Sequence, residues 1–144
     1  MAHELEIVNG NAQMAYVGDV PWHGLGTKVP ADLTPEQFMV KAGLDWTVEK
    51  EDILTRSGIK VKNKQALVRS SDGSILDVVG TGWNPVQNSE AFNFFEEYVN
   101  AGDMEMHTAG SLKDGQMVWA LAKTKDSFEL FNGDQTDNYF LFTN

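Results

Sequence analysis

Alternating apolar and polar positions mark three strands near the middle of the chain. Residues 46–55 and 60–70 each alternate, and residues 75–79 follow a turn with an Asp-Gly pair at its centre. Alternation with a period of two is typical of a strand with one buried face. An Asp-Gly pair between two such runs favours a hairpin. The pattern therefore predicts a three-stranded antiparallel meander over residues 46–80.

Two segments with helical spacing flank this meander. In the first, Thr34 suits an N-cap, a proline follows at the first helical position, and Gln37 closes a capping box. Gly43 is placed to end this helix. The second segment opens at residues 88–89, repeats aromatic side chains at helical spacing and stops at Gly102. The sequence thus predicts one helix on each side of the meander.

The remaining apolar segments complete an α+β fold. Residues 104–111 and 117–122 are expected to form a hairpin, and residues 137–144 a further strand. Helices that alternate with groups of strands predict an antiparallel sheet with the helices packed on one face. We expect a single domain over residues 21–144, preceded by a loosely ordered segment over residues 1–20.

Composition narrows the chemistry available to this fold. The 144 residues contain no cysteine, which excludes disulfides and thiolate metal sites. The net charge of -10 argues against simple nucleic-acid binding, because neutralising phosphates requires Lys and Arg. The charge is uneven, however. Residues 57–82 carry +2, whereas residues 1–56 carry -5 and residues 83–144 carry -7.

An unusual motif, Pro-Trp-His-Gly-Leu-Gly, occupies residues 21–26. Its glycines do not match a phosphate-binding loop, because no buried strand precedes them and they lie too close together. His23 and His107 are the only histidines outside the N-terminal tail. Besides the two functions given at the end of this section, they make a metal-dependent enzyme a third class of function. No spacing requires such a site, so we expect no metal, no cofactor and no enzymatic activity. We interpret the motif as a structural turn that seats Trp22 against the sheet.

A basic strip within the predicted meander offers a binding surface. The strip consists of Arg56, Lys60, Lys62, Lys64 and Arg69. No acidic residue occurs between Asp52 and Asp72. On a hairpin these cations can follow a phosphate backbone while Trp46 or Trp83 stacks on bases. The structural alternative is that the lysines protect an edge strand from unwanted pairing.

Three blocks of residues carry a family resemblance. They contain Trp22, His23, Gly24 and Gly26, then Pro85, Gln87 and Asn88, and finally His107 and Gly110. Together they resemble the phage/plasmid-like family of unknown function, from about residue 14 to the end of the chain. Members of that family are usually about twice this length, so the resemblance implies that a C-terminal half is absent here. The order of elements over residues 46–100 is similar to that of single-strand annealing recombinases, which implies a basic groove and ring-shaped oligomers.

Two functions from different classes follow. The first is a non-enzymatic accessory protein of a phage or plasmid that binds or anneals single-stranded nucleic acid through the basic hairpin, with a homo-oligomer as one option. The alternative is an acidic inhibitor that acts on a host protein, as a counter-defence factor or nucleic-acid mimic, through the carboxylates around the second helix. No apolar run approaches 18 residues, so we expect no membrane contact and a location in the bacterial cytoplasm.

Overall fold

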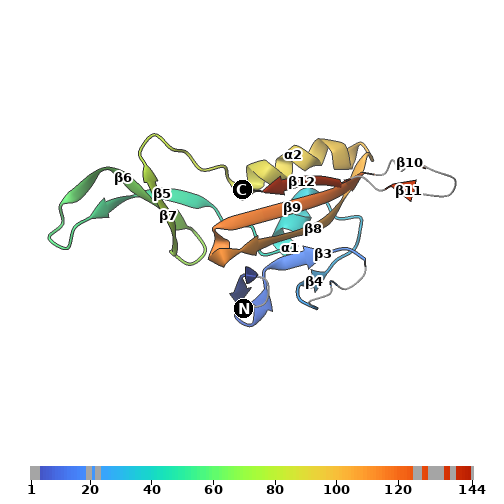
Figure 1. Cartoon of the computed structure of the whole chain (residues 1–144), viewed down its shortest axis with the longest axis horizontal. Helices are drawn as coiled ribbons and strands as arrows, with labels where there is room; N and C mark the ends of the chain where they lie inside the picture. Colours follow the sequence, from blue (N-terminus) through green and yellow to red (C-terminus); the bar gives the residue numbers. More distant parts are fainter. Residues whose placement is uncertain are drawn as a thin grey trace. The chain divides into compact units, whose positions relative to one another are not determined.

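The structure, a computed structural model, contains two compact units (Figure 1). It describes residues 4–18, 21, 24–124, 128–129, 135–136 and 139–143. The first unit comprises residues 1–45 and 88–144, and the second comprises residues 46–87. Both are built from largely antiparallel strands, and the helices belong to the first unit, which confirms the α+β class. The contacts within the chain group its residues into these two units, and our expectation of one domain over residues 21–144 stays a prediction.

A five-stranded sheet organises the first unit. The strands of this unit are β1 (Ile7–Val8), β2 (Asn11–Ala12), β3 (Met14–Tyr16), β4 (Thr27–Lys28), β8 (Met104–Leu112), β9 (Met117–Thr124), β10 (Phe128–Glu129), β11 (Gln135–Thr136) and β12 (Tyr139–Thr143). The order in the sheet is β12-β9-β8-β3-β4, and only the β3–β4 pair is parallel. A short 3-10 helix, η2 (Lys113–Gly115), joins β8 to β9. The predicted hairpin and final strand are therefore confirmed as the β8-β9-β12 part of the sheet.

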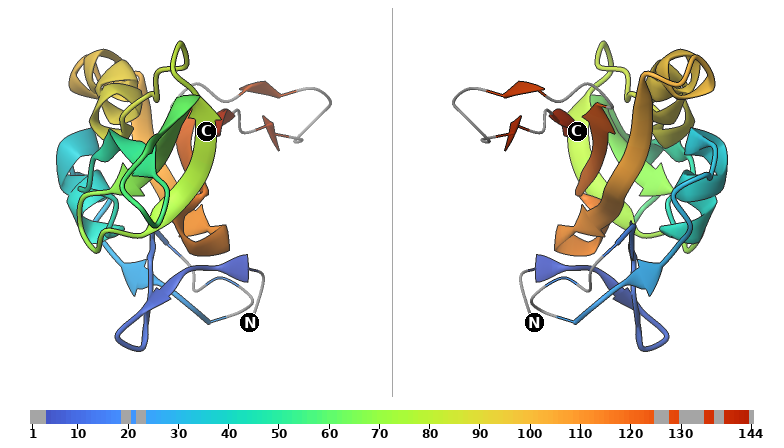
Figure 2. Two further views of the ribbon diagram at one scale, coloured as in Figure 1. Left: turned by 90° about the vertical axis from the view of Figure 1, so that its left-hand side faces the viewer. Right: turned by 90° about the vertical axis from the view of Figure 1, so that its right-hand side faces the viewer.

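Helices α1 (Pro35–Lys41) and α2 (Asn88–Asn100) lie together on one face of this sheet, as Figure 2 shows. Phe38 of α1 and Phe92 and Phe95 of α2 are fully buried. Small buried side chains, among them Ala120 and Ala122, alternate along β9. Because small residues let a helix approach the sheet closely, the bulk of this core comes from the helices.

The ends of α1 follow the predicted capping. The Thr34 hydroxyl accepts a hydrogen bond from the Gln37 amide at 3.1 Å, and the Gln37 side chain accepts one from the Thr34 amide at 3.0 Å. Gly43 follows the helix with φ of 75°, a left-handed conformation that favours glycine. At the start of α2, the Asn88 side chain donates to the Leu44 carbonyl at 2.9 Å. This bond fixes the start of α2 to the chain just after α1.

The N-terminal segment takes part in the sheet. We expected residues 1–20 to be loosely ordered, but β3 lies between β4 and β8 and Ala15 is completely buried. Leu5, Met14 and Tyr16 form a buried cluster. A strand of three residues is too short for its alternation to be recognised in the sequence. Pairing with β8 supplies the hydrogen bonds that order it.

The Trp119 ring packs directly over Gly110, the residue opposite it on β8. A methyl group added at Gly110 would overlap three carbon atoms of this ring. Trp119 also packs against the buried cluster of Leu5, Met14 and Tyr16. The glycine therefore allows the indole to lie close to the sheet and to support the N-terminal segment.

Replacing Gly110 with alanine should lower the free energy of unfolding by about 1–3 kcal/mol, because the new methyl group displaces the Trp119 ring. Urea denaturation followed by tryptophan fluorescence measures the change. Gly82→Ala is the matched control, because nothing lies within 4 Å of a methyl group there. Equal stability of the two variants would contradict this role for Gly110.

The second unit is the meander that the sequence predicts. Strands β5 (Val48–Leu54), β6 (Lys60–Arg69) and β7 (Ile75–Gly80) pair in that order, all antiparallel. The pairing of β6 with β7 extends no further toward the β5–β6 turn than Lys64, which lies opposite Gly80. Beyond that point the β5–β6 hairpin has only two strands. We call residues 53–64 the arm.

In the part of the chain that the structure describes, no helix is both long and apolar enough to cross a membrane.

Candidate nucleic-acid interface

A hydrogen-bonded turn closes the tip of the arm. The Thr55 amide donates to the Ile59 carbonyl at 2.7 Å, and the Ile59 amide donates to the Thr55 hydroxyl at 3.0 Å. Gly58 adopts φ of 88° and donates to the Thr55 carbonyl at 2.9 Å. These bonds fix the backbone that carries Arg56, which lies between Thr55 and Gly58 in the sequence.

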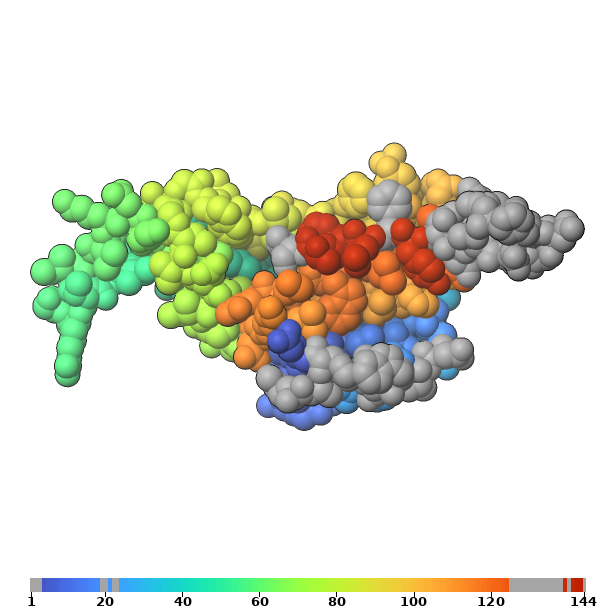
Figure 3. Space-filling view, viewed as in Figure 1, coloured from blue at the N-terminus to red at the C-terminus, as the bar shows by residue number. Residues whose placement is uncertain are grey.

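The arm carries four basic residues and no acidic residue. They are Arg56, Lys60, Lys62 and Lys64, and all four are exposed. The Lys60 ammonium lies 3.6 Å from the Asp52 carboxylate at the base of the arm, and both side chains are largely exposed. An exposed pair of this kind is weak, so it leaves the positive charge of the arm available. Figure 3 shows the arm in green at the far left.

A bulge in β6 distributes the lysines over both faces of the arm. Asp52 pairs with Gln65, and Leu54 pairs with Lys60. Between these two pairs, β5 has one residue and β6 has four, residues 61–64. Asn63, within the bulge, has φ of 62°. The Asp52 carboxylate contacts both Gln65, at 3.1 Å, and Lys60, which places these side chains on one face. Lys64 precedes Gln65 in the strand and so belongs to the opposite face, unlike the single-faced strip that strict alternation predicts.

Two residues of the predicted surface, Arg69 and Trp46, are buried. Arg69 is 5% exposed, Trp46 is 8% exposed, and the Arg69 guanidinium lies 5.2 Å from the centroid of the Trp46 ring. Arg69 also donates two hydrogen bonds to the Asp72 carboxylate, at 3.1 and 2.8 Å. Arg69 and Trp46 therefore stabilise the unit and do not form part of an exposed phosphate-binding strip.

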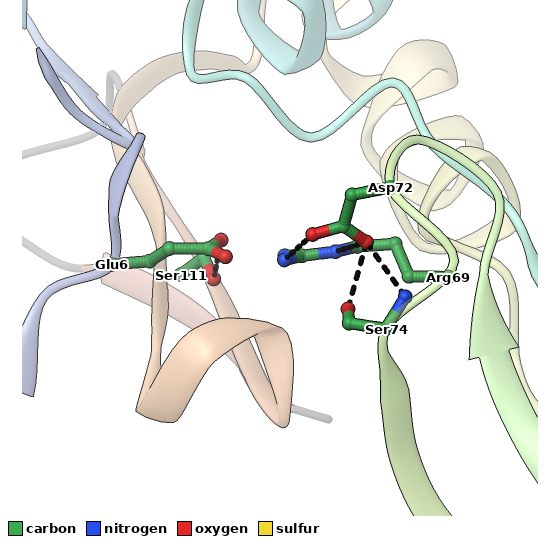
Figure 4. A network of polar contacts seen from close by, with 5 residues as sticks. All are labelled: Glu6, Arg69, Asp72, Ser74 and Ser111. Carbon is green, nitrogen blue, oxygen red and sulfur yellow. Dashed lines mark hydrogen bonds and ion pairs between the residues drawn. The ribbon is translucent and has the colours of Figure 1, made fainter. Parts of the chain in front are cut away.

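Asp72 organises the turn between β6 and β7. Besides the two bonds from Arg69, its carboxylate accepts bonds from the Ser74 amide at 3.0 Å and the Ser74 hydroxyl at 2.7 Å (Figure 4). The hydrogen bonds from Arg69, followed by those from Ser74, hold the pKa of Asp72 well below its usual range. The sequence identifies the turn, but it does not show that the turn aspartate binds the strip arginine.

Trp83 remains exposed, at 48%, on the segment that follows β7. Lys50 donates to the Thr81 carbonyl of this segment at 2.8 Å. At the end of the segment, the Gln87 amide group pairs with both backbone groups of Val48, with two bonds of 2.8 Å. Gln87 thus closes the segment onto the edge of β5. Of the two tryptophans proposed for stacking, Trp83 is the one that is accessible.

The glycines of the Pro-Trp-His-Gly-Leu-Gly motif have defined conformations. The Gly24 amide donates to the Pro21 carbonyl at 2.8 Å, and Gly24 has φ of 68°. A methyl group on Gly26 would lie 3.2 Å from Met14 atoms of β3, so glycine lets the chain pass close to that strand. Trp22 and His23 lie outside the described residues.

His107 occupies a bulge in β8, between Met106 and Thr108. Its ring centroid lies 5.5 Å from that of Tyr139 on β12, and its carbonyl accepts a hydrogen bond from the Val17 amide at 2.8 Å. Among the described residues, no three His, Asp or Glu side chains are grouped to hold a metal ion. The geometry of His107 is that of a residue packed within the sheet.

Glu6 and Ser111 form a buried polar pair among the described residues that the sequence does not predict. Both are buried, and the Ser111 hydroxyl donates to the Glu6 carboxylate at 3.0 Å (Figure 4). The Glu6 amide also donates to the Ser111 carbonyl at 3.0 Å. These bonds fix the N-terminal segment to β8. Ser111 follows the motif glycine of β8, but nothing in the sequence indicates Glu6 as its partner.

Comparison with known proteins addresses the C-terminal part of the chain. Residues 75–144 match the family described as Domain of unknown function (DUF932). This match covers just under half of the chain and includes β7, α2 and the β8-β9-β12 strands, whereas the arm precedes it. No curated protein and no solved structure matches the chain. The family that matches this part of the chain has no assigned activity, and the resemblance to phage and plasmid proteins stays a prediction.

Replacing Asp72 with asparagine should destabilise the second unit by about 1–2 kcal/mol at pH 7, because charged hydrogen bonds to Arg69 are lost. The folded pKa of Asp72 is depressed, so its contribution is fully present above the unfolded pKa and disappears as pH falls through the folded pKa. The difference in stability between wild type and variant should therefore shrink below about pH 4. Thermal melts at pH 7 and pH 3 measure it.

The control for this experiment is Asp77→Asn, which removes the same charge from an exposed position on β7 of the same unit. It should leave the melting temperature nearly unchanged at both pH values. A stability gap for Asp72→Asn that persists undiminished at pH 3 would contradict the assigned ion pair.

Proposed function

We propose that this protein binds nucleic acid, with the arm as the contact surface. The observation that carries the proposal is the arm itself, a two-stranded hairpin with four exposed cations, no carboxylate and a tip closed by backbone hydrogen bonds. Cations on a fixed backbone can neutralise phosphates at a lower entropic cost, because the backbone that carries them is already ordered. Arg56, Lys60, Lys62 and Lys64 are the expected phosphate contacts.

The division of charge between the units supports this assignment. The second unit has six basic and five acidic residues, a net charge of +1, whereas the first has five basic and sixteen acidic residues, a net charge of -11. A phosphate backbone is repelled by the first unit, so contact is confined to the arm. We expect modest affinity that falls steeply as the salt concentration rises.

Protection of strand edges does not account for the whole arm. Lysines on an exposed edge explain why other chains do not pair with it. They do not explain Arg56, which lies in the turn where there is no edge to protect, or the lack of any carboxylate from residue 53 to residue 71. Phosphate binding accounts for both features. Trp83, on the segment after β7, adds one accessible aromatic ring for stacking on bases.

The charge of -11 on the first unit also suits the alternative function, an acidic inhibitor that docks on a basic host protein. In that case the contact residues are carboxylates of the first unit, and the lysines of the arm contribute nothing to binding. A titration of the protein with nucleic acid, described next, therefore separates the two functions.

The double variant Lys62→Gln/Lys64→Gln should weaken binding of a labelled 20-nucleotide single strand and flatten its salt dependence. Loss of two phosphate contacts lowers the slope of log K against log salt concentration by about 1.4. Fluorescence anisotropy titrations at several low to moderate salt concentrations give both quantities. Lys28→Gln/Lys41→Gln, on the first unit, removes the same charge and is the matched control.

The control should bind as the wild type does. If both double variants weaken binding equally, net charge and not the arm determines affinity. If the wild type shows no binding even at the lowest salt concentration, the proposed function is wrong and the acidic alternative gains support.

A further inference from the structure

We infer that the form of nucleic acid the arm recognises is double-stranded DNA, with the arm lying in a groove and Leu54 and Ile59 wedged against base pairs at its tip. The inference rests on the proposed function, nucleic-acid binding by the arm, and specifies which form of nucleic acid the arm binds. It depends on three observations about the arm, which concern its apolar tip, the placement of its charges and the aromatic ring that it lacks.

The tip of the arm exposes two branched aliphatic side chains beside its turn. Leu54 is 59% exposed and Ile59 is 66% exposed, on either side of the turn. Single exposed aliphatic residues are ordinary, but here two of them lie within the arm, the most cationic stretch of an acidic chain. Leucine and isoleucine are among the apolar side chains that minor-groove-binding proteins insert between base steps, where they partly unstack the duplex.

The turn holds this apolar tip in place. The Ile59 backbone is bonded to Thr55 through both its amide and its carbonyl, at 3.0 and 2.7 Å. A wedge must push against stacked bases, so it has to be supported by a backbone that does not yield. The strand pairing between Leu54 and Lys60 supplies the same support on the other side of the turn.

The cations lie on both faces of the arm, which suits a groove. Lys60 shares a face with Asp52 and Gln65, and Lys64 lies on the opposite face. A ribbon inside a groove has a phosphate backbone on each side of it, so Lys60 and Lys64 can each reach phosphates from their own face. A single strand offers only one phosphate backbone, and a strip on one face would suffice to follow it.

The arm itself carries none of the aromatic side chains on which unpaired bases stack. Stacking platforms for unpaired bases are aromatic rings. Trp46 is buried against Arg69, and Trp83 lies on the segment after β7, outside the arm. The arm itself, residues 53–64, contains no aromatic residue. Aliphatic side chains serve as wedges rather than as platforms, so the composition of the arm favours a duplex.

The test compares Leu54→Ser and Ile59→Ser with Ile75→Ser. Ile75 is 65% exposed on β7, outside the arm, and none of the three changes alters the charge. The probes are a 20-base-pair DNA duplex with a central 2-aminopurine and the corresponding single strand. Unstacking raises 2-aminopurine fluorescence, and anisotropy gives the affinity for each probe.

The wild type should bind the duplex more tightly than the single strand and should raise 2-aminopurine fluorescence in the duplex. Leu54→Ser and Ile59→Ser should each abolish most of this rise and weaken duplex binding about tenfold, the loss expected when an apolar side chain is no longer buried. Single-strand affinity and the salt dependence should stay within twofold of the wild type. Ile75→Ser should behave as the wild type.

The outcomes distinguish this inference from the proposed function. If the chain binds single strands more tightly than the duplex, or if the two tip variants keep full duplex affinity and fluorescence, the wedge is wrong while nucleic-acid binding stands. If neither probe binds at low salt, the proposed function itself fails, and the inference fails with it.

Discussion

The close approach of the Trp119 ring to the backbone at Gly110 is the contact on which much of the first unit depends. Because Gly110 has no side chain, the indole can lie close to the β8-β9 hairpin and present its surface to the N-terminal segment. Leu5, Met14 and Tyr16 pack against this surface, and β3 then pairs with β8. Gly26 in turn lets the motif segment pass close to Met14. The absence of a side chain at Gly110 thus determines how the N-terminal segment packs on the sheet.

The second unit is stabilised in a different way. A three-stranded sheet of this size has little apolar surface to bury, and Ile75 and Val78 remain exposed on it. Its best-buried group is charged, because Arg69 lies against Trp46 and bonds with Asp72. A guanidinium is suited to this place, since its flat face packs on an indole while its edge donates to a carboxylate. The electrostatic contact fixes the β6–β7 turn and supplements a small set of buried apolar side chains, which are Trp46, Val48, Ala66 and Leu67.

The elements that the sequence predicts correctly are those whose signals lie within a few neighbouring residues. The capping box at Thr34 and Gln37 and the Asp-Gly turn lie within a few residues, and the structure contains both as predicted. The bulge at Asn63 depends on pairing between strands, so alternation alone placed the lysines on one face. For a similar reason the sequence does not predict that Arg69 is buried, because its partner Trp46 lies outside β6. Local patterns thus identified the elements, but not the faces of their side chains.

The adjacent amides Gln87 and Asn88 have a consequence for how this chain is constructed. Asn88 holds the carbonyl of Leu44 within the first unit, and Gln87 holds Val48 within the second. The two points where the chain leaves and re-enters the first unit are therefore neighbours. In the sequence, the second unit is inserted between α1 and α2, and both of its ends connect to the same place in the first unit. Such a module can be lengthened, exchanged or deleted in evolution while the surrounding helices and sheet keep their own hydrogen bonds.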